Sequence, residues 1–410
     1  MKSMFTVDQK KLEEKIKTFS QFGATGNGGI TRFSLSPEAL MARDEFVKRM
    51  TAAGAEVKFD DVANMYATLP GSEPGLKSIV MGSHCDSVRN GGNYDGILGV
   101  MTAMEVIETI SHQKIPHRHP ITAMVWTNEE GSLYAPAMMC SGIICGKFEK
   151  ATMIESKNPN GVTFGEALEK FKYKGEEKNR LNANEYMAML ELHIEQGPIL
   201  EAEKKDIGVV TCVLGMCNYR IRTYGQSDHA GTTPMKFRKD ALYAAAQLLI
   251  KLHEELDKLD PALVYTTGEI ICKPCVHTVI PNHVDFSIDA RHEDPEVVKK
   301  VEQIIQSLPK EIAKCRVETQ KAWGRDTVYF DKELVGIVKK NADAFGYSNM
   351  YINSGAGHDA QFVSGMMPTT MIFVPSKDGH SHCEEEFTPI EQCGMGANVL
   401  LNTALDIDKK

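Results

Sequence analysis

Several features are missing from this sequence of 410 residues, and each absence argues against a class of protein. No apolar run approaches the length of a membrane-spanning helix, and residues 1–8 lack the long apolar core of a secretory signal peptide. There is no basic stripe or polybasic segment, and the formal net charge is -9. Neither nucleic acid nor a membrane surface is therefore an expected partner. We expect a cytoplasmic protein.

Cysteine is present without forming a recognisable framework. The ten cysteines are scattered along the chain, which is typical of reduced cytosolic thiols. Cys272 and Cys275 form a single CxxC with no second pair, so a zinc knuckle is not expected. The sequence also lacks a Gly-Lys-Ser/Thr phosphate loop and a G-x-S-x-G nucleophile elbow. Neither a P-loop nucleotide-binding protein nor a serine hydrolase of the α/β-hydrolase type is therefore expected.

Length and pattern predict two domains of the α/β class. Hydrophobic residues make up 42% and charged residues 25%, which is ordinary for a globular protein, and one hydrophobic core rarely serves 410 residues. Residues 207–323 follow a β-α-β-β-α-β order, typical of a ferredoxin-like unit, with a strand over 209–223 and a helix over 294–314. This unit interrupts the first domain, which we assign to residues 1–206 and 324–410.

One stretch organises the rest of the chain. Gly82 to Gly96 follows a short apolar run that predicts a buried strand, and precedes a predicted helix. His84 and Asp86 therefore lie where a strand ends, and ligands collect at such ends in α/β sheets. The imidazole of His84 could bind a metal, Asp95 could bridge two metals, and Asp86 could orient the imidazole. The alternative is that these residues only form turns.

Further polar side chains follow other predicted strands. Glu129 and Glu130 end one strand, where one carboxylate could bind metal while the other moves protons. A solvated acidic turn is the alternative for this pair, and a satisfied core histidine is the alternative for His193. Together with His84, Asp95 and His382, these residues predict a two-metal site. Zinc, manganese or cobalt would suit it, whereas magnesium and calcium prefer oxygen ligands alone.

At these residues the sequence resembles the M20 superfamily of metallopeptidases and amidohydrolases, and within it the hydantoinase/carbamoylase branch. The motifs that carry the resemblance are Gly82-Ser83-His84-x-Asp86-Ser87-Val88-x-x-Gly91-Gly92-x-x-Asp95-Gly96, Glu129-Glu130-Gly131-Ser132, Glu191-Leu192-His193-Ile194-Glu195-Gln196-Gly197, Ser227-Asp228-His229-Ala230-Gly231-Thr232-Thr233-Pro234-Met235 and Ser381-His382. The resemblance covers nearly the whole chain. It implies an α/β/α catalytic domain with a mixed sheet, and an inserted ferredoxin-like domain that serves as lid and dimerisation domain.

The resemblance also implies roles for these residues. One metal is assigned to His84, Asp95 and His193, and the other to Asp95, Glu130 and His382. Glu129 becomes the general base, which takes a proton from water and returns it to the departing nitrogen, and Asp86 supports the metal ligands. The substrate is expected to contact Gln196, His229, Thr278, Arg291 and Gly357, with the guanidinium of Arg291 on a carboxylate. The branch usually has Asn where this chain has Thr278.

Two substrates are compatible with the resemblance. The segments around Asn90, Arg291 and Gly357 are most similar to allantoate amidohydrolases, which form ureidoglycine, ammonia and carbon dioxide. An N-carbamoyl-L-amino acid hydrolase or a β-ureidopropionase is the alternative. A di-zinc aminopeptidase or dipeptidase is disfavoured by His193, where such relatives usually carry a carboxylate. A silent binding protein is disfavoured by the intact Glu129. The resemblance further implies a homodimer in which His229 reaches the partner's site.

Overall fold

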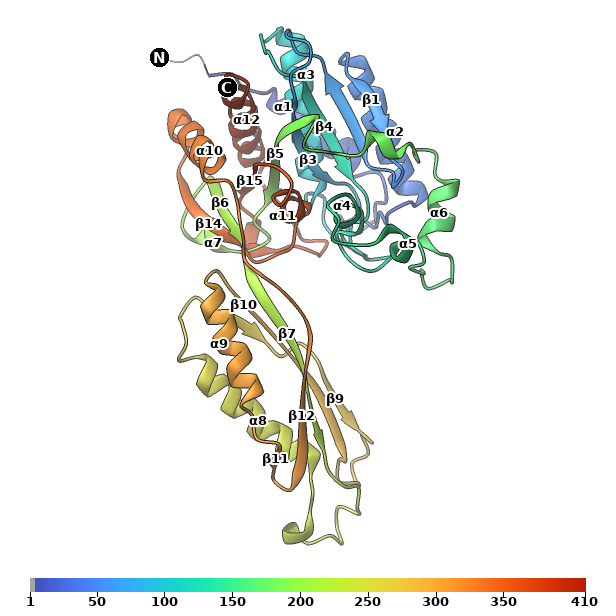
Figure 1. The fold of residues 1–410 in the computed structure, drawn as a ribbon, viewed down its shortest axis with the longest axis vertical. Coiled ribbons are helices and arrows are strands. Elements are labelled where there is room, and N and C mark those ends of the chain that lie inside the picture. The colour runs from blue at the N-terminus through green and yellow to red at the C-terminus, as the bar shows by residue number, and fades with distance from the viewer. Residues whose placement is uncertain (1–3) are drawn as a thin grey trace. The chain divides into compact units, whose positions relative to one another are not determined.

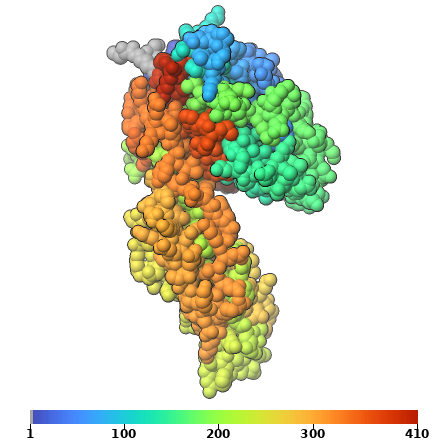
Figure 2. Space-filling model, in the orientation of Figure 1, coloured from blue at the N-terminus to red at the C-terminus, as the bar shows by residue number. Residues whose placement is uncertain are grey.

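The structure is a computed structural model that describes residues 4–410, so the first three residues of the predicted segment 1–206 lie outside it. The chain forms two compact units. One contains the residues up to Thr211 together with Tyr329–Lys410, and the other is Cys212–Val328 (Figure 1). On the face of the larger unit seen in Figure 2, the last segment, orange to red, is packed beside the first segment, blue to green.

The larger unit is built on a mixed sheet of nine strands. They are β1 (Glu56–Phe59), β2 (Met65–Leu69), β3 (Ser78–His84), β4 (Ile121–Trp126), β5 (Tyr186–Ile194), β6 (Ile207–Val213), β13 (Val328–Tyr329), β14 (Asn349–Ser354) and β15 (Thr369–Val374). Strands β4, β3, β5 and β15 are neighbours in that order and run parallel. On their outer sides β2 pairs antiparallel with β4, and β6 pairs antiparallel with β15. The prediction of a mixed α/β sheet is confirmed.

Helices cover both faces of this sheet. They are α1 (Gln9–Phe19), α2 (Pro37–Ala52), α3 (Ile97–Gln113), α4 (Met139–Ile144), α5 (Lys150–Met153), α6 (Phe164–Lys170), α7 (Ile199–Ala202), α10 (Lys332–Phe345), α11 (Asp359–Val363) and α12 (Ile390–Ile407). Helices α3 and α12 contact each other and the central strands. On the opposite face, Val363 of α11 shares a buried cluster with Val80 and Trp126. The parallel strands are buried on both sides, as their apolar sequences require.

The smaller unit has its own antiparallel sheet and core. Its strands are β7 (Gly215–Tyr224), β8 (Val264–Thr266), β9 (Ile270–Lys273), β10 (His283–His292), β11 (Glu311–Ile312) and β12 (Cys315–Arg325), and its helices are α8 (Ala241–Leu256) and α9 (Pro295–Gln306). The sheet order is β11-β12-β7-β10-β8, and β9 also pairs with β10. Burial alternates along β10, and its inward residues Phe286 and Ile288 share a core with Leu248 of α8 and Val301 of α9.

Two sequence predictions about this region were wrong in detail. The helix predicted over 294–314 ends at Gln306, because Pro309 has no N–H and disfavours helical geometry in the residue before it. The strand predicted over 209–223 is two strands, β6 and β7, which pair in different sheets. Among residues 4–410, no helix combines the length and the apolar character needed to cross a membrane.

Candidate metal centre

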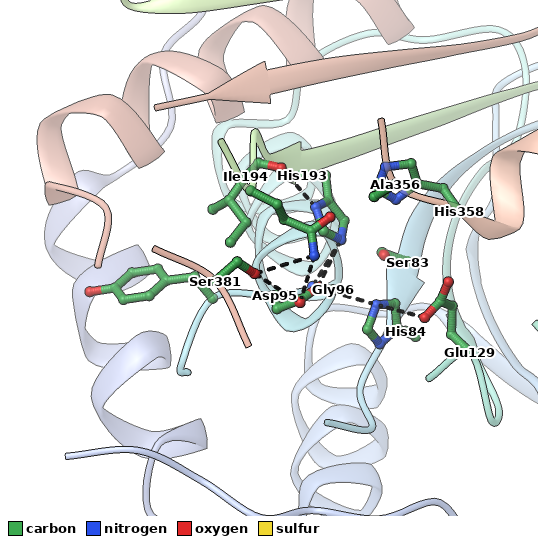
Figure 3. Close-up of polar contacts among 12 residues, drawn as sticks. Ser83, His84, Asp95, Gly96, Glu129, His193, Ile194, Ala356, His358 and Ser381 are labelled. Atoms are coloured by element: carbon green, nitrogen blue, oxygen red, sulfur yellow. Dashed lines mark hydrogen bonds and ion pairs between the residues drawn. The ribbon is translucent and has the colours of Figure 1, made fainter. Parts of the chain in front are cut away.

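Polar side chains from several segments of the larger unit meet at one edge of its sheet. His84 is the last residue of β3, His193 is the second-last residue of β5, and Glu129 follows the end of β4. Because these strands are parallel, their C-terminal ends lie at the same edge. Asp95 approaches from the start of α3. Figure 3 shows these four side chains close together, with dashed lines marking the polar contacts between them.

The carboxylate of Asp95 lies between three imidazoles. Its Oδ1 is 3.6 Å from His84 Nε2 and 3.2 Å from His193 Nε2, and its Oδ2 is 3.0 Å from His382 Nε2. Among residues 4–410, three groups of residues have ligand atoms that all lie within 4.8 Å of one another. Asp95 belongs to two of them, His84, Asp95 and His193, and Asp95, Glu130 and His382, and the third is Glu191, His193 and His358. Asp95 therefore has the position of a bridging carboxylate.

Backbone carbonyls fix the orientation of two of these imidazoles. His84 Nδ1 lies 3.0 Å from the carbonyl oxygen of Asp86, and His193 Nδ1 lies 2.9 Å from that of Ile194. A carbonyl oxygen only accepts hydrogen bonds, so each Nδ1 carries the proton. With Nδ1 as the protonated nitrogen, Nε2 is the atom available to a metal near Asp95, which is the arrangement that metal-binding histidines adopt.

Gly96 makes room for the ring of His84. Its φ is 63°, and a Cβ added there would lie 2.2 Å from His84 Nε2. A larger residue at this position would have to displace the imidazole or the turn that carries Asp95. The glycine in the sequence Asp95-Gly96 is thus required by the close approach of a ring.

Asp86 connects the end of β3 with the paired glutamates. Its Oδ1 accepts a hydrogen bond from the N–H of Glu129 at 3.3 Å, and its Oδ2 accepts one from the N–H of Glu130 at 3.2 Å. The contact with His84 Nδ1 is made by the backbone carbonyl, since the carboxylate oxygen is 3.9 Å from that nitrogen. Asp86 therefore fixes the positions of His84, Glu129 and Glu130 relative to one another.

The pKa shifts show that the centre stabilises positive charge. Burial would raise the pKa of Asp95, but hydrogen bonds with His193, His382 and His84 lower it well below its usual range. Burial raises the pKa of Glu130 to about 8, and the charge of Asp95 adds to this effect. The hydrogen bond with Asp95 raises the pKa of His382 to about 9. The raised pKa values of Glu130 and His382 mean that bound protons compensate negative charge in this cluster. A metal cation could compensate the same charge in their place.

The donor set fits a divalent metal of borderline softness. Imidazole nitrogens together with carboxylate oxygens suit zinc, manganese or cobalt. Within the described part of the chain, the buried oxygens Glu130 Oε1 and Gln196 Oε1 have no hydrogen-bond partner. Buried polar atoms rarely remain unsatisfied, and a bound ion or substrate would provide their missing partners.

Some contacts at the centre were not predicted from the sequence. Glu386 Oε1 accepts hydrogen bonds from the N–H groups of Tyr94 and Asp95 at 2.9 Å and 3.0 Å. Its Oε2 accepts one from Ser381 Oγ at 3.0 Å. Gly92 permits this approach, because a Cβ there would lie 2.2 Å from the Glu386 carboxylate. The only signal in the sequence is an acidic run after His382, which by itself is typical of a solvated loop.

The predicted substrate residues of the larger unit lie beside the candidate metal ligands. Gln196 Nε2 donates a hydrogen bond to Asp95 Oδ2 at 2.8 Å. Gly357 precedes His358, whose ring centroid is 4.6 Å from that of His193. Both residues are thus at the candidate centre.

The remaining predicted residues belong to the smaller unit and occupy two places in it. His229 and Thr278 lie together, because the N–H of Ala230 donates to the carbonyl of Thr278 at 2.8 Å. Both side chains are exposed. Arg291 lies near the other end of β10, where its Nε donates to Asp289 Oδ1 at 2.7 Å.

The sequence matches the peptidase family M20/M25/M40 over residues 80–406. It is 33% identical to an N-carbamoyl-L-amino-acid amidohydrolase of Paenarthrobacter aurescens, with 98% of each chain covered. It is also 33% identical to an allantoate amidohydrolase of Bacillus subtilis, with 96% of each chain covered. Among solved structures, a hydantoinase/carbamoylase-family amidase of Burkholderia multivorans matches with a TM-score of 0.91, 37% identity and 99% of each chain covered.

Fold, candidate metal-ligand groups and relatives together define a hydrolase that acts on C–N bonds. The chain belongs to the peptidase family M20/M25/M40. The resemblance to this family and to hydantoinase/carbamoylase amidases is therefore confirmed. The two named activities occur among relatives of equal identity, so identity alone does not distinguish their substrates.

Proposed function

We propose that the protein is a two-metal amidohydrolase that cleaves the ureido or carbamoyl C–N bond of a small carboxylated substrate. The observation that carries this proposal is the position of the Asp95 carboxylate, with His84 and His193 near Oδ1 and His382 near Oδ2. One ion would be held by His84, Asp95 and His193, and the other by Asp95, Glu130 and His382. Zinc, manganese or cobalt bound there would polarise an amide carbonyl and acidify water.

Glu129 is the residue that we assign as general base. Its Oε2 lies 3.6 Å from His84 Nε2, at the edge of the proposed centre. Burial raises the pKa of Glu129 well above its usual range, and the charges of Asp359 and Glu130 add to the rise although His84 opposes it. A buried carboxylate with a raised pKa can accept a proton from water and then deliver it to the departing nitrogen. The carboxylate of Asp86 accepts hydrogen bonds from the backbone N–H groups of Glu129 and Glu130 and so holds Glu129 in place.

His229 is suited to stabilise the oxyanion that forms on the amide carbonyl. The N–H of Gly231 donates a hydrogen bond to His229 Nδ1 at 3.0 Å. Since Nδ1 accepts, the proton of the neutral ring is on Nε2, and that N–H is a donor on an exposed side chain. Preorganised donors of this kind stabilise developing negative charge.

Allantoate is the substrate that we propose first. Its carboxylate would bind the guanidinium of Arg291, and Gln196, Thr278 and Gly357 would contact the remaining polar groups. The products would be ureidoglycine, ammonia and carbon dioxide. An N-carbamoyl-L-amino acid is the second candidate, because relatives with that activity are as similar to this chain as the allantoate amidohydrolases.

We also propose that the enzyme is a homodimer in which the smaller unit, a ferredoxin-like insertion, serves as lid and dimerisation domain. Arg291 lies eight positions along β10 from His283, which corresponds to about 27 Å at the rise of a β-strand. The pairing continues past His283, where His229 forms a bridge with Val279. One small substrate cannot contact both Arg291 and His229 of the same chain. This separation supports a site in which His229 comes from the partner.

A cytoplasmic location is the last part of this proposal. All ten cysteines are free thiols. Reduced thiols in this number are typical of a reducing compartment.

The substrate is tested by measuring ammonia release from a panel of ureido compounds with metal-loaded protein. The panel contains allantoate, ureidoglycolate, N-carbamoyl-β-alanine and several N-carbamoyl-L-amino acids. We expect the highest kcat/KM for allantoate. A preference for an N-carbamoyl-L-amino acid would favour the second candidate, and no turnover of any member would contradict the proposed function.

Thr278 provides a further test of the substrate contacts. The Thr278→Asn variant introduces the amide that the branch usually has at this position. We expect it to change the ranking of substrates in the same panel. An unchanged ranking would show that Thr278 does not contact the substrate.

A further inference from the structure

Arg32 is a fully buried cation next to the candidate centre that the proposed mechanism does not use. It lies between α1 and α2, and its side chain is about 1% exposed. Its Nε donates to the carbonyl of Cys85 at 2.5 Å, and its Nη1 donates to the carbonyls of Phe19 and Phe22, each at 3.0 Å. One guanidinium therefore joins the end of α1 to the loop that follows β3.

The backbone of Arg32 holds the same loop a second time. Its N–H donates to Ser87 Oγ at 2.9 Å, and its carbonyl accepts from the N–H of Ser87 at 2.9 Å. Together with the bond to Cys85, these contacts fix the residues on both sides of Asp86. A loop of three residues is thus held at each end by one arginine.

Asp86, which lies between Cys85 and Ser87, contacts three residues of the candidate metal centre. The carbonyl of Asp86 accepts from His84 Nδ1, and its carboxylate accepts from the N–H groups of Glu129 and Glu130. A displacement of Asp86 would therefore move a metal ligand and the general base together.

The positive charge of Arg32 also favours the position of the loop from Cys85 to Ser87, because it lies near the Asp86 side chain. Burial lowers the pKa of the guanidinium, and the nearby Cys85 and Asp86 side chains oppose that effect. A buried cation is costly unless its hydrogen bonds and nearby charges compensate it. These three side-chain hydrogen bonds of Arg32 go to backbone carbonyls, and the Asp86 carboxylate accepts from the N–H groups of Glu129 and Glu130.

We propose that Arg32 is a positioning residue for the metal centre. It holds the loop from Cys85 to Ser87 so that Asp86 can orient His84 and the paired glutamates. This inference rests on the proposed function, because it takes His84 as a metal ligand.

The test measures Co²⁺ binding to metal-depleted protein, by calorimetry and by the visible absorption of the bound ion. In Arg32→Lys a point charge replaces the planar fork, and one ammonium cannot reach acceptors in both directions. We expect Co²⁺ affinity to fall about tenfold to a hundredfold, as for other residues that orient metal ligands. We also expect the absorption spectrum to change, which a general loss of stability would not produce.

Arg238→Lys is the matched control. Its guanidinium also donates to backbone carbonyls, those of Thr233 and Ala230, but in the smaller unit. This variant should bind Co²⁺ like the wild type. His84→Ala is the reference for a lost ligand.

The outcomes separate the two proposals. If His84→Ala loses Co²⁺ while Arg32→Lys binds it with unchanged affinity and spectrum, the role of Arg32 is overturned and the centre stands. If His84→Ala also binds normally, the proposed centre itself is overturned. Should Arg32→Lys fail to fold, Ser87→Ala provides the deciding measurement, since it removes the Oγ that accepts from the Arg32 N–H and donates to the neighbouring carbonyl of Val88. Weaker Co²⁺ binding by Ser87→Ala would support the inference, and unchanged binding would overturn it.

Discussion

Asp95 and Glu129 are both buried carboxylates, yet their surroundings shift their pKa values in opposite directions. Imidazoles lower the pKa of Asp95, whereas burial and the neighbouring acids raise the pKa of Glu129. Such divergence between neighbouring titratable groups is a recurring feature of acid–base catalysis. It supports a bridging role for Asp95 and a proton-transfer role for Glu129.

The role of Glu129 predicts a specific defect in Glu129→Gln. The amide keeps the size of the side chain and can remain buried, but it cannot accept a proton. We expect kcat for ammonia release to fall by about 10²–10⁴, with the bound metal content unchanged by elemental analysis. Glu385→Gln, an exposed substitution nearby, is the control and should retain full activity. Normal turnover by Glu129→Gln with full metal content would exclude it as the base.

Arg291 is expected to determine the affinity for the substrate carboxylate. Its guanidinium is already oriented by Asp289, through Nε at 2.7 Å and Nη2 at 3.3 Å. In Arg291→Lys we expect KM to rise roughly 10- to 100-fold, because a hydrogen bond to a charged group contributes about 1.5–3 kcal/mol. Arg220→Lys is matched to it, as Arg220 forms ion pairs with Asp285 and Glu269 in the same sheet. Equal KM values for both variants and the wild type would refute this assignment.

At the scale of whole elements, helix α1 is held to α3 by a buried ion cluster. Lys15 Nζ lies 2.5 Å from Glu105 Oε2 and 2.7 Å from Glu108 Oε2, and Lys15 is fully buried. The start of α3 carries Asp95, so this cluster stabilises an element that contributes to the centre.

Loss of the Lys15 charge should therefore destabilise the fold. In Lys15→Met two carboxylates remain buried without their cation, which costs about 3–5 kcal/mol. We expect the midpoint of urea unfolding to fall accordingly. Lys17→Met changes an exposed pair with Glu13 on the same helix and should alter stability by at most about 0.5 kcal/mol. Similar midpoints for the two variants would contradict the importance of the cluster.

The sequence could predict those parts of the centre that depend on local pattern. Apolar runs indicated the parallel strands, and the chemistry of their last residues indicated that His84 and His193 would lie near Asp95. Contacts between distant loops have no such signal. Glu386 reaches the N–H of Asp95 across 291 residues of sequence, and no local pattern around Arg32 indicates that its side chain is buried. Burial of a guanidinium can be recognised only when the surrounding carbonyls are located.

At the scale of the whole molecule, one chain supplies two units with different sets of site residues. The larger unit contains the candidate metal ligands and Glu129, and the smaller unit contains His229, Thr278 and Arg291. The length of β10 places His229 and Arg291 too far apart for one small substrate. The shared site that we propose in a two-fold dimer would explain why both are present.

Complementation between inactive variants tests the shared site. Glu129→Gln and His229→Ala chains are mixed under conditions that allow dimers to exchange, and exchange is followed by mass. If His229 acts on the partner's site, each mixed dimer has one intact site, so roughly a quarter of all sites should recover activity. If each chain uses its own His229, no site is intact. Confirmed exchange without recovered ammonia release would exclude the shared site.

The central claim is that ammonia release depends on divalent metal held around Asp95. The most direct test is a titration of metal-depleted protein with zinc, manganese or cobalt, following ammonia release from allantoate at each step. The account predicts no activity in the depleted protein, recovery as metal is added, and saturation at two ions per chain. Full activity in the metal-depleted protein, or recovery that is unchanged in an Asp95→Ala variant, would contradict it.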